Sequence, residues 1–344
     1  MSETTKQALK SYFESKLEGA VNLRISDFKQ PSAGWSDEAF IFNVNWESDG
    51  ETHQKGFAIR KQNKGGLMRE NKNFYNQYNF LDILSKNCDL PVPGVHWYET
   101  DESILGGSFF VMDKLEGAAY VPWSKEGQQF LKQAHDDGHI PQQFVELLAK
   151  LHLLDYQEAG FTKDFTEPVG PYGYIDSKIK GLEEMYNRYL ISPDPVMVDA
   201  LEWLKANKPA AQRYSIVHND YRTGNLLYKN NEITGILDWE AAEIGDPMAD
   251  VAYVCAKSNR MDSPLLCYLL DRDMFYETYS KLTGLQVDEK VVHYYEVFHQ
   301  VRFVLISQSA GTSFAKGQTQ DLRMARQGYR WPLMRGMVAE LLGY

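Results

Sequence analysis

The chain has 344 residues, and its 36 Lys and Arg residues against 47 Asp and Glu residues give a net charge of −11. With 43% hydrophobic and 24% charged residues, the composition is typical of a globular protein and excludes a fibrous or disordered chain. The acidic balance argues against a general nucleic-acid binder, and the longest apolar runs, six residues each, are far below the roughly 20 residues of a membrane-spanning helix.

The start of the chain and its cysteines bear on the compartment. Met1 to Lys6 carries no apolar core of a secretory signal, and three cysteines give no even, dense disulfide framework. We therefore expect a cytoplasmic protein.

The first third predicts strands with one helix. Apolar residues alternate from Ala39 to Trp46, and Asp49-Gly50 marks a tight turn into a second strand. Helical spacing then predicts a helix that proline ends. The predicted strands after the turn lie near 56–61, 95–99 and 104–112, and the helix covers 68–87.

From Gly117 onward the pattern predicts helices. Apolar stripes at helical spacing run from Ile140 to Leu151 and from Val291 to Leu305, and two short β-rich pieces interrupt them within 214–238. We therefore predict an α+β protein with a small β-rich lobe, 1–115, followed by a larger helical lobe, 116–344.

The stretch 215–254 carries the chemistry. Asn230-Asn231 lies between two apolar strands and favours a hairpin turn, which would bring Asn225 and Asp238 to the same open end. An amide oxygen and a carboxylate that converge are ligands suited to Mg²⁺. Asp220, off the metal, would accept the proton of an attacking hydroxyl. Arg222 would place a cation near the transferred group, so the pattern predicts a phosphoryl-transfer site.

These residues resemble the aminoglycoside phosphotransferase family, which includes choline-kinase-like enzymes and is related to the protein kinases. The family pattern His-Gly-Asp-x4-Asn is similar to His218-Asn219-Asp220 with Asn225, although Asn219 replaces the glycine. Asp238-Trp239-Glu240 and Gly245-Asp246-Pro247 match the family's metal-binding segment, most closely in the kinase domains associated with acyl-CoA dehydrogenases. The resemblance implies a bilobal protein-kinase-like fold, with ATP and Mg²⁺ as cofactors.

The resemblance also implies roles in the first lobe. By strand parity Arg60, rather than Lys61, shares a face with Ala58 and takes the place of the phosphate-binding lysine. Glu70 is its expected helix partner. The remaining expected nucleotide contacts are a phosphate-binding turn with Ser32, Gly34 and Ser36, and an adenine-binding hinge with Met112, Asp113 and Leu115.

Other readings stay open at this point. The short segment after Asp238 lacks the protein kinases' long activation segment, which favours a small-molecule hydroxyl acceptor over a protein. A nucleotide-binding pseudokinase that acts as a sensor or scaffold is the alternative, and an ATP-independent binding protein is a third. Asp246, Asp250, His218 and His152 are expected to be structural.

The sequence leaves the acceptor undecided. The subfamily resemblance implies a hydroxyacyl-CoA, and the segment 301–344, with six basic and two acidic residues, would suit its phosphates through Arg302, Arg323, Arg326, Arg330 and Arg335. The wider family implies aminoglycosides, macrolides, choline or amino alcohols. Residues 151–200 carry nine acidic and four basic residues, which would suit a cation. Oligomeric state is not predicted.

Overall fold

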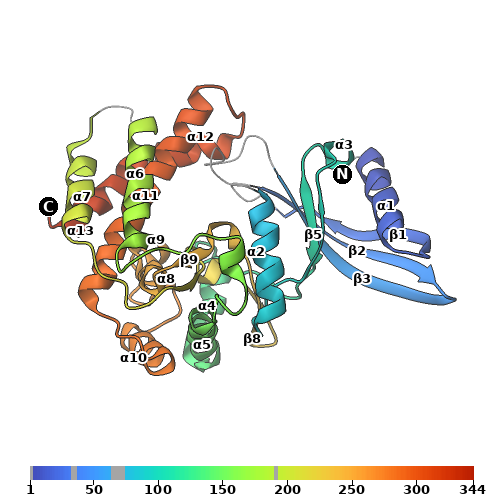
Figure 1. Ribbon diagram of the computed structural model, residues 1–344, viewed down its shortest axis with the longest axis horizontal. Coiled ribbons are helices and arrows are strands. Elements are labelled where there is room, and N and C mark those ends of the chain that lie inside the picture. Colours follow the sequence, from blue (N-terminus) through green and yellow to red (C-terminus); the bar gives the residue numbers. More distant parts are fainter. Residues whose placement is uncertain (1–2, 32–36, 63–73, 190–192) are drawn as a thin grey trace. The chain divides into compact units, whose positions relative to one another are not determined.

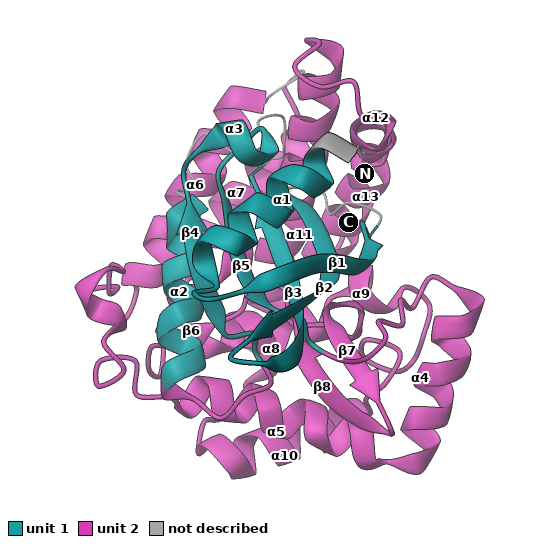
Figure 2. Cartoon of the chain, turned by 90° about the vertical axis from the view of Figure 1, so that its right-hand side faces the viewer, with its two compact units in different colours: residues 1–86, 92–115 teal, residues 87–91, 116–344 magenta. Residues whose placement is uncertain are grey.

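The computed structural model describes residues 3–31, 37–62, 74–189 and 193–344. The chain divides into two compact units, coloured separately in Figure 2. The N-terminal unit comprises Met1–Lys86 and Val92–Leu115, and the C-terminal unit comprises Asn87–Pro91 and Glu116–Tyr344. The short segment 87–91 groups with the second unit because Ile236 N–H donates to the Pro91 carbonyl and Lys150 pairs with Asp89.

The N-terminal unit is built on a five-stranded antiparallel sheet in the order β1-β2-β3-β5-β4. A two-residue turn at Asp49 and Gly50, both with positive φ, sets the β2–β3 register, as the sequence predicts. The strands are β1 Val21–Lys29, β2 Glu38–Ser48, β3 Glu51–Lys61, β4 Val95–Glu99 and β5 Phe109–Asp113.

Helices lie against this sheet (Figure 1). Helix α1, Glu3–Lys16, packs Phe13 against Phe42 and Phe57. Helix α2, Phe74–Asn87, packs Phe74 against Phe110, whose strand neighbours Phe109 and Val111 join the cluster around Phe13. Because side chains alternate along a strand, the two helices cover opposite faces of the sheet.

Two predictions about the first third are wrong. The unit contains more than strands with one helix, since helix α1 and strand β1 precede the predicted elements. The strand predicted near 104–112 begins only at Phe109. Its first residues form a short helix, α3 Glu102–Leu105, because the Asp101 side chain caps the helix start and Gly106 ends it with a φ of 81°.

The C-terminal unit is mainly helical. The stripe predicted over 140–151 lies in α5, where Ile140, Phe144 and Leu148 are fully buried. The longest helix, α11 Glu289–Ala315, is surrounded by α6, α7, α8, α12 and α13. The other helices are α4 Lys125–Asp137, α5 His139–Leu153, α6 Gly173–Tyr189, α7 Pro195–Ala206, α8 Pro247–Cys255, α9 Lys257–Arg260, α10 Arg272–Thr283, α12 Leu322–Tyr329 and α13 Trp331–Leu342.

The architecture is thus the predicted α+β arrangement, with an antiparallel sheet in one unit and helices in the other. In the described parts of the chain, no helix combines the length and apolar character that a membrane crossing requires.

Candidate active site

Two short strand pairs in the C-terminal unit hold the candidate site. Strand β6, Ser215–Val217, pairs with β9, Glu243–Gly245, and β7, Leu226–Lys229, pairs with β8, Glu232–Ile236. The β7–β8 turn is formed by Asn230 and Asn231, which both have positive φ, as the hairpin prediction requires.

The hairpin brings the two predicted metal ligands to one end. Leu226 is registered with Ile236, and Leu237 N–H donates to the Asn225 carbonyl at 2.8 Å. Asn225 and Asp238 therefore flank the open end of the hairpin, as expected.

Asp220 lies on the loop before the hairpin, and its side chain is only 23% exposed. Its carboxylate accepts hydrogen bonds from Asn225 Nδ2 at 2.7 Å, from Arg222 Nε at 3.1 Å and from the Tyr253 hydroxyl. Three donors from three directions fix the orientation of this carboxylate.

The orientation of the Asn225 amide follows from its neighbours. Its Nδ2 donates to both the carboxylate and the backbone carbonyl of Asp220, at 2.7 and 2.8 Å. Since both of these neighbours are acceptors, the nitrogen has to face them. Oδ1 is then the Asn225 atom that could ligate a hard cation.

Asp238 has a left-handed backbone conformation, with φ 69° and ψ 51°. This conformation is costly for a non-glycine residue and persists only where its surroundings hold it. Here it begins the 3₁₀ turn Trp239–Ala241, and the buried Trp239 indole donates to the Ile236 carbonyl at 2.9 Å. The hairpin and the anchored indole together hold the aspartate next to Asn225.

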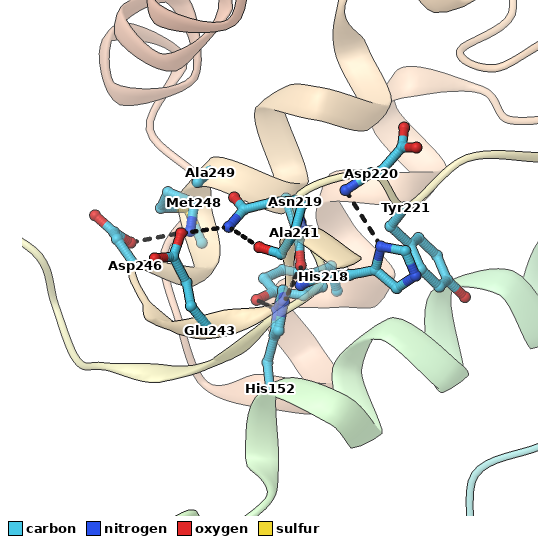
Figure 3. Close-up of polar contacts among 12 residues, drawn as sticks. His152, His218, Asn219, Asp220, Tyr221, Ala241, Glu243, Asp246, Met248 and Ala249 are labelled. Carbon is cyan, nitrogen blue, oxygen red and sulfur yellow. Dashed lines mark hydrogen bonds and ion pairs between the residues drawn. The ribbon is translucent and has the colours of Figure 1, made fainter. Parts of the chain in front are cut away.

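The His218 side chain connects the loop that carries Asp220 to the segment that carries Leu237 and Asp238. It is fully buried; its Nε2 donates to the Leu237 carbonyl at 2.9 Å, and its Nδ1 accepts the Asp220 N–H at 3.2 Å (Figure 3). These bonds need one proton on the ring and select one tautomer. His218 is therefore part of the scaffold, as expected.

Asp250 braces the same loop. Its carboxylate accepts the backbone N–H groups of His218 and Asn219, at 2.7 and 2.6 Å, and His152 Nε2 at 3.1 Å. Burial alone would raise the pKa of Asp250, but the hydrogen bonds and electrostatic influence of His152 and His218 together outweigh burial and lower it. The expected structural roles of Asp250 and His152 agree with these contacts.

Asn219, where the resembled motif has glycine, has a φ of 61°. Asparagine is one of the few other residues that tolerate this region. Its side chain donates to the Ala241 carbonyl and to Glu243 Oε1, at 3.1 and 2.7 Å, and accepts from the Tyr174 hydroxyl at 3.2 Å (Figure 3). The substitution thus keeps the backbone conformation and adds a side-chain network.

Arg222, expected to place a cation near the transferred group, pairs with the Asp220 carboxylate. Its Nε bonds to Asp220, and its guanidinium lies over the Trp123 ring, 5.6 Å from the centroid. Burial disfavours the charge, but Asp220 outweighs burial and raises the pKa of Arg222 above its ordinary value. The guanidinium is a permanent cation at this site.

Sequence reasoning missed Tyr253. Burial raises the pKa of its hydroxyl well above the ordinary value, so the group stays protonated and donates to Asp220. Tyr253 lies three residues after Asp250 on α8, so it points to the same side of that helix. The three-residue spacing between Asp250 and Tyr253 was the sequence signal that could have identified Tyr253.

In the N-terminal unit, Ala58 and Met112 are registered partners on β3 and β5. Arg60 Nε lies 3.4 Å from Asp37 Oδ2, and that oxygen also accepts from Gln77 of α2, whereas Lys61 pairs with Glu38. Arg60 therefore faces the α2 side and Lys61 the other, as the strand parity predicts.

Asp37 was not anticipated as a partner of Arg60. It is 5% exposed and immediately precedes β2. The expected partner Glu70, and the expected phosphate contacts Ser32, Gly34 and Ser36, lie outside the described residues.

At the expected hinge, backbone groups are partly in use. Asp113 N–H donates to the Gly94 carbonyl at 2.8 Å, and the Asp113 side chain pairs with Lys55 and His96 at 2.9 and 2.8 Å. The Asp113 N–H is therefore already bonded within this unit.

Three of the six basic residues of the segment 301–344 bond to partners within their own unit. Arg323 pairs with Asp321 at 2.6 Å, Arg335 with Asp194 at 3.5 Å, and Arg302 donates to the Asn219 carbonyl at 3.4 Å. Arg326 and Arg330 are exposed. The charge of this segment is thus less available to a ligand than the composition implied.

A fold of this kind, with this arrangement of aspartates and asparagine, defines a kinase-like phosphotransferase. The model of the phosphotransferase enzyme family matches residues 27–284. The chain belongs to that family.

Individual relatives extend this picture. Mouse acyl-CoA dehydrogenase family member 10 is 29% identical over 63% of the chain, which spans only 20% of that protein. A crystal structure of a Ralstonia eutropha protein assigned to the aminoglycoside phosphotransferases superposes with a TM-score of 0.68, at 22% identity and 97% coverage of both chains. The GDP complex of aminoglycoside 2'-phosphotransferase-IIIa gives a TM-score of 0.62 at 16% identity, covering 96% of this chain and 98% of that one.

Proposed function

We propose that the chain is an ATP- and Mg²⁺-dependent kinase that phosphorylates a hydroxyl group of a small molecule. The observation that carries this proposal is the Asp220 carboxylate, fixed by three donors, beside the Asn225 and Asp238 pair. A related fold solved with bound GDP supports a nucleotide as the donor.

Asp220 would act as the base. Its carboxylate accepts the proton of the acceptor hydroxyl as that oxygen forms a bond to the γ-phosphorus and the bond between this phosphorus and the ADP oxygen breaks. Arg222 balances the negative charge that accumulates on the transferred group. Positioning and electrostatics supply most of the catalysis in such transfers.

Asn225 Oδ1 and the Asp238 carboxylate would hold Mg²⁺. Both are hard oxygen donors, and the hairpin brings their residues to one end. Bound Mg²⁺ would neutralise phosphate charge. In the N-terminal unit we assign ATP contacts to Arg60, Ala58, Met112, Asp113 and Leu115.

The acceptor is proposed to be a small molecule. Only a 3₁₀ turn and the short strand β9 separate Asp238 from α8, which the Asp246 side chain caps at Met248 N–H. We favour a hydroxyacyl-CoA, because the chain resembles part of an acyl-CoA dehydrogenase family member; aminoglycosides and amino alcohols are the competing class.

Asp220→Asn tests the base. Loss of a general base lowers turnover by roughly 10²–10⁴-fold, so we expect this loss in ADP release measured with an acceptor, with ATP affinity retained. Asp136→Asn is a matched control, since Asp136 is exposed and pairs with Lys132 one helical turn away. Turnover of Asp220→Asn within two-fold of the control would contradict the assignment.

A panel of acceptors tests the substrate class and the pseudokinase alternative together. Hydroxyacyl-CoA thioesters and aminoglycosides are incubated with Mg-ATP, and products are detected by mass spectrometry. Phosphorylated thioester supports the proposal, and phosphorylated aminoglycoside alone contradicts the acyl-CoA assignment. ATP binding that a chelator leaves unchanged, with no product from either class, would identify a pseudokinase.

A further inference from the structure

A small pocket within the C-terminal unit shares a wall with the proposed base. Its lining includes Arg222, whose Nε is bonded to Asp220. Thr223 and Asn259 also line the pocket. The other described lining residues are Pro122, Trp123, Arg222, Ser258, Met261 and Tyr268.

The pocket is apolar, although it adjoins a charged site. Trp123 is 70% exposed and Met261 39% exposed, so both present hydrophobic surface to water. Large apolar side chains held at the surface next to a reactive group mark a place where ligand covers them. Met261 and Tyr268 also have left-handed φ values of 49° and 61°, which for such residues often accompany functional sites.

The charge of the pocket has one sign. Its eight described lining residues include no Asp or Glu, and Arg222 supplies a permanent cation. A protonated amine in this pocket would meet the Arg222 guanidinium, and the adjoining Asp220 carboxylate already accepts hydrogen bonds from Arg222, Asn225 and Tyr253. A neutral carbon chain would gain contact with Trp123 and Met261.

Ser258 adds an unsatisfied polar group to the wall. Its Oγ is buried and has no hydrogen-bond partner in the described structure. An unpaired buried hydroxyl is unfavourable, and in a pocket wall it is a donor for a ligand oxygen.

We propose that this pocket binds the uncharged carbon skeleton next to the reacting hydroxyl of the acceptor, with a ligand oxygen on Ser258 Oγ, and that it disfavours cationic acceptors. The proposal rests on the proposed function and deepens it. Trp123 is the residue that determines this specificity.

Two alcohols of equal length test the charge preference. We expect 1,6-hexanediol to be phosphorylated with a kcat/KM at least ten-fold above that of 6-aminohexan-1-ol, which is protonated at neutral pH. Trp123→Ala should raise the KM for hexanediol about ten-fold and leave the KM for ATP unchanged, and Trp123→Glu should reverse the preference. Tyr329→Ala, at an 89% exposed aromatic outside the pocket, should change neither constant.

Ser258→Ala separates the polar contact from packing. Because the hydroxyl has no partner to lose, we expect an unchanged unfolding temperature and a raised KM for hexanediol. A lowered unfolding temperature with an unchanged KM would assign Ser258 a structural role and overturn its part in the proposal.

A binding measurement keeps this proposal separable from the kinase activity. Hydrogen peroxide oxidises exposed methionine, and oxidation of Met261 can be followed by peptide mass spectrometry. We expect hexanediol to protect Met261 and 6-aminohexan-1-ol to protect it less. Protection without any phosphorylated product would overturn the kinase assignment alone, whereas equal use of both alcohols and no protection would overturn the pocket assignment.

Discussion

Asn219 illustrates how one residue fixes the backbone of the catalytic loop. At its φ of 61°, alanine is strained by roughly 1–2 kcal/mol, whereas glycine is not. Both substitutions remove the bonds to Ala241 and Glu243. We therefore expect Asn219→Ala to lower the unfolding temperature more than Asn219→Gly. Equal losses in thermal unfolding would show that the side-chain network, rather than the backbone, is the reason for asparagine here.

Tyr253 is the positioning residue that we assign to the base. Tyr253→Phe removes a donor from the Asp220 carboxylate but keeps the ring contact with His299, whose centroid is 5.0 Å away. We expect kcat to fall about ten-fold, equivalent to ~1.4 kcal/mol, with the KM for ATP and the unfolding temperature nearly unchanged.

The control for this experiment is a half-buried hydroxyl outside the site. Tyr276→Phe removes the contacts of Tyr276 with Cys255 and Arg272, which lie outside the site. It should leave kcat intact. A kcat unaffected by Tyr253→Phe, or lowered equally by both substitutions, would contradict the assignment.

At the scale of residues, local sequence patterns predicted the contacts between residues that are close in the sequence. Asn225 and Asp238 were brought together by a hairpin whose turn residues are visible in the chain. The Asp37 contact of Arg60 and the Tyr253 contact of Asp220 span 23 and 33 residues. Tertiary packing decides these partners, so turn and strand patterns could not reveal them.

At the scale of elements, α11 and α12 approach closely where glycine meets glycine. A Cβ at Gly328 would lie 2.4 Å from the Gly311 Cα, and a Cβ at Gly311 would lie 3.1 Å from the Gly328 Cα. Gly-to-Ala in a helix normally stabilises by about 0.5–1 kcal/mol, but overpacking typically costs about 1–3 kcal/mol. We expect Gly328→Ala to destabilise, and more than Gly311→Ala.

Gly181 of α6 is the matched control, because a Cβ there meets nothing within 4 Å. Gly181→Ala should raise the free energy of unfolding, which urea titration measures for all three variants. If Gly328→Ala were as stable as Gly181→Ala, the close helix packing would not be a determinant of stability.

The elements were predictable to different degrees. The apolar stripe in α5 and the β2–β3 hairpin have strong periodicity and a recognisable turn, and both were predicted. Helix α3 has four residues, too few for periodicity, and its capping aspartate and terminal glycine resemble a strand turn. Its identity depends on the cap geometry, which a pattern search does not resolve.

For the whole molecule, the net charge of −11 conceals local balances. Arginine and aspartate side chains pair within the C-terminal unit, as Arg222 does with Asp220 and Arg335 with Asp194. The sequence therefore predicted the fold class and the motif better than it predicted which charged residues pair with one another. Composition counts charges, but pairing depends on which surfaces the helices bring together.

Opposing buried groups around α8 and α11 should make stability depend on pH. Burial raises the pKa of Asp246 from 3.8 to about 6, so between these values the folded chain holds a proton that the unfolded chain releases. The contribution of Asp246 to the free energy of unfolding is therefore lost as pH rises through that window. Burial lowers the pKa of His299 from 6.5 to about 4. The contribution of His299 to the free energy of unfolding is therefore lost as pH falls from 6.5 to about 4.

Replacing either Asp246 or His299 should leave a pH dependence of stability that is set by the other residue. Asp246→Asn keeps Oδ1 for the bond from Met248 N–H, replaces Oδ2 with an amide N–H that can donate to the Tyr295 hydroxyl, and cannot ionise. Relative to the native chain, this variant should gain on the order of 2–3 kcal/mol as pH rises from 4 to 7, since one pKa unit corresponds to about 1.4 kcal/mol. His299→Gln, which can still donate to the Ala249 carbonyl, should gain stability relative to the native chain as pH falls. Urea titrations at pH 4.5, 5.5 and 7 measure both slopes, and pH-independent differences for both variants would show that neither group titrates as its burial requires.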